Sequence, residues 1–198
     1  SKSFLGGISE LTYPSMVVMR AMFDFLIIET VGVGQSETYI KNLSDSVILG
    51  VQPGSGDSIQ FMKSGIFEIP DIVVVTKCDI KNLSEITYSD LSGSKAYFQS
   101  QNEWEIKIIK TSSAQNIGFD NLFDELNLRW KWLNDNKRLD KLRINQDINW
   151  LYSCISKDFG DKGLERIKRN VSYKNSPFSK LKELKLSLIH ISEPTRRP

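Results

Sequence analysis

The chain has 198 residues, 40% of them hydrophobic and 10% aromatic, a composition typical of a globular protein with one good-sized core. No apolar run is long enough to span a bilayer, and Cys78 and Cys154 have no CxxC or histidine partner, which argues against a membrane protein, a disulfide framework and a zinc site. Residues 1–128 are acidic, with 9 Lys/Arg against 16 Asp/Glu, and residues 129–186 are basic, with 15 Lys/Arg against 7 Asp/Glu. The basic residues of the second part lie in helical patterns without an aromatic stacking platform. A solvated helix face is therefore favoured over nucleic-acid binding.

Four short runs rich in β-branched residues are predicted strands, because their near-continuous apolar character is typical of strands covered on both faces. They are residues 23–30, 45–52, 71–79 and 104–113. Helical patterns alternate with them over residues 36–43, 57–69 and 84–101. This alternation predicts right-handed βαβ units in a mostly parallel sheet of a three-layer α/β fold, which binds ligands beyond the carboxyl ends of its strands.

The pattern becomes helical after Phe119. Apolar residues recur every three or four positions as far as Phe159, which is long for one globular helix. Residues 134–137 (NDNK) are a plausible break in it. Gly160 and Gly163 are expected to form a C-cap and turn before a further helical pattern.

These patterns divide the chain into three parts. Residues 1–128 are expected to form an α/β domain, and residues 129–186 a helical arm that needs a partner for its apolar face. Residues 187–198 (SLIHISEPTRRP) follow no helical or strand period and resemble translated sequencing-adaptor DNA, so we interpret them as a non-native or disordered tail. The only histidine, His190, lies in this tail and is therefore not a catalytic candidate.

The most specific chemical signal is TKCD, residues 76–79, at the end of a predicted strand. Guanine presents two parallel donors, N1–H and the N2 amine, and a fixed carboxylate such as Asp79 accepts both. Lys77 would lay its aliphatic stem along the base, and Thr76 would tie neighbouring loops together. A plain strand-end turn is the alternative for this motif taken by itself.

A second signal, TSSA at residues 111–114, follows the next predicted strand. It has the form of the loop whose backbone N–H groups contact guanine O6 in GTPases, with Ser113 and Ala114 as the expected contact positions. An ordinary Ser/Thr turn is the alternative. Because both motifs occur in order on consecutive strands, guanine recognition is the better interpretation.

The sequence ETVG supplies a third signal at the end of the first predicted strand. Glu29 is the type of residue that holds Mg²⁺, usually through water, and Gly32 lies at the spacing where a backbone N–H reaches a γ-phosphate. Gly34 would keep the loop mobile as a switch, and Gln35 could position water. The alternative for Glu29 is a carboxylate capping the next helix, although Ser36 is better suited to that task.

The phosphate-binding loop itself is absent. No GxxxxGK followed by Ser or Thr occurs in the chain, and PGSGDS at residues 53–58 has no Lys-Ser/Thr to replace it. We therefore expect the chain to begin downstream of its phosphate loop and to lack GTPase activity by itself.

Several segments together resemble one family. FLGGIS, ETVGVGQSE, QPGSGDSIQFMKSGIFEIPDIVVVTKCD and KTSSA are similar in order and spacing to the MeaB/ArgK family of P-loop GTPases, once described as LAO/AO transport ATPases. The resemblance covers roughly residues 4–160. It implies a P-loop NTPase-type sheet, here without its N-terminal strand and phosphate loop, and a C-terminal helical arm that forms a homodimer. It also implies binding of GTP, GDP and Mg²⁺, and a GTP-hydrolysing chaperone of an adenosylcobalamin-dependent acyl-CoA mutase of the methylmalonyl-CoA type.

The resemblance assigns roles to single residues as well. Glu29 and Gly32 match the Mg²⁺ and γ-phosphate switch, and the two loops described above match the guanine site. Residues 52–63 match a third switch through which the mutase stimulates hydrolysis, with Asp57 and Lys63 as its charged candidates. A plain N-cap for Asp57 and a solvated helix face for Lys63 are the alternatives.

Three other functions remain open. A nickel-insertion GTPase would carry His-rich or CxxC segments, which the chain lacks. A non-catalytic protein that dimerises through its helical arm and keeps a vestigial G domain is compatible with the missing phosphate loop. A nucleic-acid binder would show a steep salt dependence of affinity, which we do not expect. The expected location is the cytoplasm, or the mitochondrial matrix in a eukaryote.

Overall fold

The computed structural model describes residues 11–30, 37–54, 69–98, 103–168 and 176–192. The chain divides into two compact units, residues 1–139 and 140–198, and each is described by itself. The domain limits expected from the sequence, at residues 128 and 186, remain predictions. In the described ranges, no helix combines the length and apolar character needed to cross a membrane.

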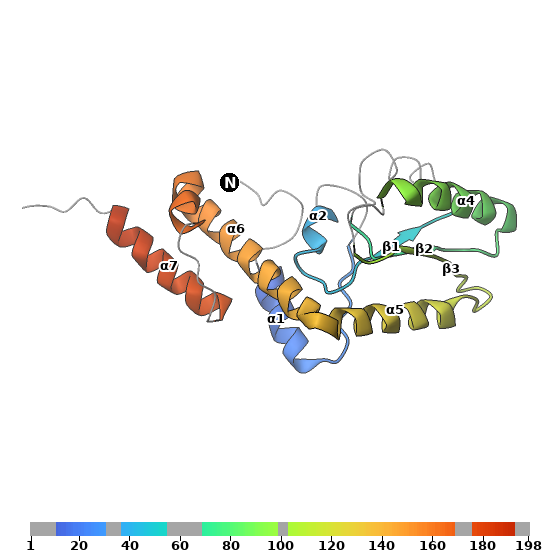
Figure 1. The fold of residues 1–198 in the computed structure, drawn as a ribbon, viewed down its shortest axis with the longest axis horizontal. Coiled ribbons are helices and arrows are strands. Elements are labelled where there is room, and N and C mark those ends of the chain that lie inside the picture. Colours follow the sequence, from blue (N-terminus) through green and yellow to red (C-terminus); the bar gives the residue numbers. More distant parts are fainter. Residues whose placement is uncertain (1–10, 31–36, 55–68, 99–102, 169–175, 193–198) are drawn as a thin grey trace, which may run out of the picture. The chain divides into compact units, whose positions relative to one another are not determined.

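The first unit is built on a parallel sheet with helices on both sides. Its described elements, in chain order, are α1 (Thr12–Met22), α2 (Glu37–Ile40), β1 (Ile48–Val51), β2 (Ile72–Val75), α4 (Lys81–Phe98), β3 (Lys107–Lys110), α5 (Phe119–Asn134) and the 3-10 helix η3 (Asp135–Lys137). The strands lie in the order β1-β2-β3, with Ile48 opposite Ile72 and Ile72 opposite Lys107. Figure 1 shows α4 and α5 on opposite sides of this sheet. The predicted three-layer α/β fold is therefore confirmed.

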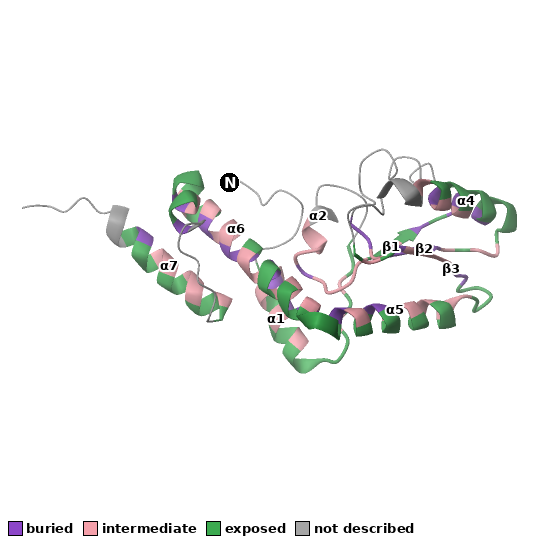
Figure 2. Ribbon diagram, in the orientation of Figure 1, coloured by how far each residue is buried: buried purple, intermediate pink, exposed green. Residues whose placement is uncertain are grey.

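The central strand, β2, forms the middle of the core. All four of its residues are buried, and Val73 and Val75 pack with Val51, Leu91 and Ile106. Figure 2 shows this buried strand between the partly exposed helices. A central parallel strand is covered on both faces, so every position must be apolar. This requirement explains why the sequence of β2 shows no polar alternation.

A buried ion pair fastens α5 to the start of β2. Arg129 Nη2 lies 2.9 Å from Asp71 Oδ1, and the two side chains are only 8% and 17% exposed. Asp71 Oδ2 also accepts the Val47 N–H at 2.8 Å, and the guanidinium lies 5.0 and 4.5 Å from the ring centroids of Trp104 and Trp132. Burial raises the pKa of the Asp71 carboxyl more than Arg129 lowers it, and burial also lowers the pKa of Arg129. The pair thus has a desolvation cost, and the two tryptophan rings add a favourable cation–π interaction with the guanidinium.

The prediction of a strand at residues 23–30 is wrong. The segment is irregular, and its side chains Phe25 and Ile27 are 92% and 91% exposed. A strand needs a neighbour for its backbone N–H and C=O groups, and none of the three described strands pairs with this segment. Glu29 therefore lies on an exposed irregular segment and not at the end of a buried strand.

The other predicted elements of the first unit agree better with the structure. The expected strands at 45–52, 71–79 and 104–113 correspond to β1, β2 and β3, and the expected helix at 84–101 corresponds to α4. The helix expected at 36–43 is shorter, because α2 gives way to a turn after Ile40. The helix expected at 57–69 lies outside the described residues except at its last position.

The interruptions predicted in the helical part are largely confirmed. The break at 134–137 is η3, where Asn136 has a left-handed φ of 52°. The following helix is interrupted at Gly160, with φ 64° and ψ −167°. Gly163, in contrast, lies in a helical stretch, where an added Cβ would come within 2.4 Å of Phe159 Cβ. Gly163 therefore allows close packing against Phe159 and is not part of the expected turn.

The second unit contains α7 and nearly all of α6. Their bounds are α6 (Arg138–Lys168) and α7 (Pro177–Ser192). Ile155, Ile167 and Leu188 form a buried cluster, and Trp150 meets Phe178 edge to face at 5.1 Å. The expectation that the last twelve residues follow no helical period is therefore wrong for residues 187–192, because α7 continues through them and buries Leu188.

Candidate functional site

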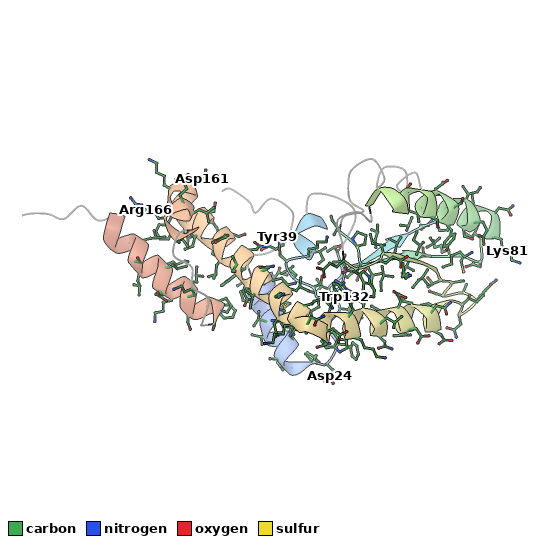
Figure 3. The ribbon with its side chains drawn as sticks, viewed as in Figure 1. Asp24, Tyr39, Lys81, Trp132, Asp161 and Arg166 are labelled. Carbon is green, nitrogen blue, oxygen red and sulfur yellow. The ribbon has the colours of Figure 1, made fainter. Side chains whose placement is uncertain are left out.

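The loops that follow the three strands are joined at one edge of the sheet. The Thr76 N–H donates to Val51 O at 2.9 Å, and the Thr111 N–H donates to Val75 O at 2.8 Å. Beyond the strand ends, the Cys78 N–H donates to Thr111 O at 3.0 Å. Because parallel strands end on the same side, these bonds bring TKCD and TSSA together as predicted from their order. In Figure 3, Lys81, the first residue of α4, marks this end of the sheet, and Trp132 lies toward the opposite end.

Asp79 is held by a serine of the neighbouring loop. Ser112 is completely buried, and its Oγ donates to Asp79 Oδ1 at 2.5 Å. The same Oγ accepts the Gln115 N–H at 3.2 Å, so both roles of the hydroxyl are used. A carboxylate offers about four lone-pair sites, so this bond restrains the Asp79 side chain and leaves capacity for two parallel donors. That is the arrangement a guanine-reading carboxylate requires.

The TSSA loop is closed behind this serine. Backbone N–H and C=O groups of Ser112 and Ile117 exchange two hydrogen bonds of 3.0 Å. Gly118 has φ 82°, and a Cβ there would lie 1.9 Å from Lys110 O, so only glycine fits. Ser113 and Ala114 lie exposed in the turn between. Their assignment as base-contacting positions remains a prediction.

Sequence reasoning missed Ser112. The motif has two adjacent serines, and we assigned a contact to the second, although the first lies next to the strand end. In a turn that leaves a strand, the first side chain still lies at the sheet edge and can be buried. The short distance in sequence between Ser112 and the end of β3 therefore indicated that Ser112 could be buried. Its role as a partner of Asp79 could be recognised only once the position of Asp79 was known.

Thr76 and Lys77 connect TKCD to the loop that follows β1. Thr76 Oγ1 donates to the backbone oxygen of Val51, the last residue of β1, at 3.3 Å, in addition to the backbone bond; its role in tying neighbouring loops stays a prediction. Lys77 is exposed, has a left-handed φ of 51°, and donates from Nζ to Gln52 Oε1 at 3.1 Å. Ser84 Oγ donates to Cys78 O at 3.3 Å, which secures the loop to α4.

The residues expected on the phosphate side are not assembled in the described part of the chain. Glu29 is exposed. Gly32, Gly34, Gln35, Asp57 and Lys63 all lie outside the described residues. Within the described ranges, no three His, Cys, Asp or Glu side chains gather as ligands for a metal ion. The Mg²⁺ role of Glu29 therefore remains a prediction that rests on sequence alone.

The sequence of the chain is similar to those of known GTPases. A family model described as "Methylmalonyl Co-A mutase-associated GTPase MeaB" matches residues 1–167. A probable GTPase of Mycobacterium tuberculosis is 30% identical over 170 residues, covering 84% of this chain and 49% of the relative. GTPase ArgK of Escherichia coli is 30% identical over 155 residues (76% and 47%), and a Caenorhabditis elegans protein named methylmalonic aciduria type A homolog, mitochondrial, is 28% identical over 155 residues (76% and 39%). The chain thus spans about half the length, or less, of these curated relatives.

Proposed function

Since the chain belongs to the MeaB family of methylmalonyl-CoA mutase-associated GTPases, we propose that the complete gene product binds and hydrolyses GTP and serves as a chaperone that assembles or protects an adenosylcobalamin-dependent acyl-CoA mutase. The observation that carries the nucleotide part is the bond from buried Ser112 to Asp79. It supports a carboxylate that is fixed before the base arrives. A fixed acceptor costs less to organise at the moment of binding.

The proposed base site uses residues from two loops. Asp79 accepts the N1–H and the N2 amine of guanine, while the stem of Lys77 covers the ring. The backbone N–H groups of Ser113 and Ala114 donate to O6. Adenine has an acceptor at N1, no amine at C2 and a donor amine at C6, so it would leave the Asp79 carboxylate without its two donors.

On the phosphate side, we propose Glu29 as a Mg²⁺ ligand, through water, and the Gly32 N–H as the γ-phosphate contact. When bound, Mg²⁺ would neutralise charge on the phosphate oxygens. Gly34 would let the loop reorganise, and Gln35 would orient the attacking water. Residues 52–63, with Asp57 and Lys63, would respond to the mutase.

Hydrolysis is proposed for the complete gene product, not for residues 1–198 by themselves. These residues contain no GxxxxGK followed by Ser or Thr, and without that loop the β- and γ-phosphates lose their cradle. The helical arm, residues 129–186, is proposed to form a homodimer, and the cytoplasm is the proposed location, or the mitochondrial matrix in a eukaryote.

Two measurements on the complete gene product test this function. The first is its GTP hydrolysis rate with and without an adenosylcobalamin-dependent acyl-CoA mutase, where we expect the mutase to increase the rate. No change in rate would refute the chaperone assignment. The second is Asp79→Asn, which replaces one acceptor with an amide donor and should shift preference from GDP to xanthosine diphosphate, whose C2 carries an oxygen. An unchanged preference would refute the base site.

A further inference from the structure

The turn after β1 contacts the lysine of the proposed guanine site. Lys77 Nζ donates to Gln52 Oε1 at 3.1 Å, although the two residues are 25 positions apart. The Lys77 backbone is left-handed, which is uncommon for a residue with a side chain and occurs chiefly where the surroundings enforce it. The conformation and the contact together fix both ends of the lysine.

The position of Gln52 is itself fixed from two sides. Thr76 donates to Val51 O from both its N–H and its Oγ1, at 2.9 and 3.3 Å. On the other side, Gly54 has a left-handed φ of 71°, and a Cβ there would lie 3.2 Å from Leu83 Cδ1 on α4. The turn is therefore anchored to the base-reading loop and to the helix that follows it.

We propose that Gln52 is a positioning residue that holds the Lys77 ammonium, so that the lysine stem is already laid out for the base before a nucleotide binds. This role rests on the proposed function. A free lysine side chain has much rotamer entropy to lose, and an existing contact removes part of that cost from the binding step. A carboxamide also suits the task electrostatically, because it accepts a hydrogen bond without placing a negative charge near the phosphates of a nucleotide.

The contact also links two segments with different predicted tasks. Gln52 is the first residue of the segment 52–63 that resembles a third switch. If Lys77 is held by Gln52 when a base is bound, the base and this turn stabilise each other, since coupling between two sites is reciprocal.

A double-mutant cycle on the complete gene product tests this role, with dissociation constants for fluorescent GDP. Gln52→Met keeps the length of the side chain but removes its acceptor, and we expect roughly two- to tenfold weaker binding. In a Lys77→Met background the same change should have almost no effect, because the partner is already gone. The ratio of affinities for GDP and xanthosine diphosphate should stay unchanged, because Asp79 reads the base edge.

The control is Asn82→Ala, which removes an exposed carboxamide at the start of α4. We expect GDP affinity within about twofold of the wild type, as is usual for surface changes. Equal losses from Gln52→Met in both backgrounds, with tight GDP binding by the wild type, would overturn the role of Gln52 and leave the proposed function intact. Absence of GDP binding by the wild type would overturn both.

Discussion

Replacing Ser112 with alanine removes the hydroxyl that holds Asp79. In the wild type this Oγ donates to Asp79 Oδ1 at 2.5 Å and accepts the Gln115 N–H at 3.2 Å. We expect Ser112→Ala to leave the fold around β3 unchanged, because alanine is smaller than serine and fits the same space. It leaves the Asp79 carboxylate without its donor, and the Gln115 N–H without its acceptor.

The expected loss follows from the type of bond. A hydrogen bond to a charged group contributes about 1.5 to 3 kcal/mol, more than a neutral one. Because Ser112 is completely buried, water does not easily replace its hydroxyl. If the full contribution is needed to orient Asp79, the dissociation constant for GDP should rise roughly ten- to a hundredfold.

Titration of the complete gene product with fluorescent GDP measures this change. Ser89→Ala, an exposed serine on α4, is the matched control and should leave the affinity unaltered within about twofold. Thermal unfolding of both variants separates a loss of base recognition from a loss of folded protein. Wild-type affinity in the Ser112→Ala protein would refute the reasoning, and a loss confined to Ser113→Ala would move the role to the next residue.

Three further changes test the framework. Gly118→Ala should destabilise the protein by more than about 1 kcal/mol, because its Cβ would lie 1.9 Å from Lys110 O; an unchanged urea midpoint would contradict this. Arg129→Ala should cost about 3 to 5 kcal/mol by leaving the buried Asp71 carboxylate without its ion-pair partner, and the double variant with Asp71→Asn should recover part of the loss in urea unfolding. Leu188→Ala should cost about 2 to 5 kcal/mol in the second unit, read from faster hydrogen exchange in α7; unchanged exchange would show that this residue is not buried.

The fold was predictable where the sequence reports burial directly. The run from Ile72 to Val75 is apolar at every position, and the structure buries all four residues. The order of strands and helices then limits the sheet to parallel connections, which β1, β2 and β3 follow. The break at residues 134–137 was predictable for a similar reason, because NDNK interrupts the apolar period and contains residues that tolerate a left-handed backbone.

The segment 23–30 shows what such a pattern does not contain. Its sequence, FDFLIIET, has a run of four apolar residues from Phe25 to Ile28, yet Phe25 and Ile27 are almost fully exposed. Apolar character reports the tendency of a segment to be covered, whereas strand formation also requires a partner at hydrogen-bonding distance. The partner strand lies elsewhere in the sequence, so the apolar pattern of one segment does not show whether a partner is available.

The prediction for residues 187–192 failed for a different reason. Considered from residue 187 onward, the segment is too short to show a helical period. From Leu181, however, the spacing through Leu184 to Leu188 is three and then four residues, and these side chains pack in one cluster with Ile155. The helical period therefore continues across residue 187. The composition of the last twelve residues suggested a tail, whereas the spacing of the leucines indicated a helix.

In the described part of the chain, the proposed base-reading loops are joined by contacts among strand-end residues. These contacts join Thr76 to Val51, Cys78 to Thr111, and Ser112 to Asp79. If base recognition and phosphate chemistry are separable, as we propose, changes at Ser112 should alter which nucleotide binds and how tightly, whereas changes at Glu29 should alter the response to Mg²⁺ and the hydrolysis rate.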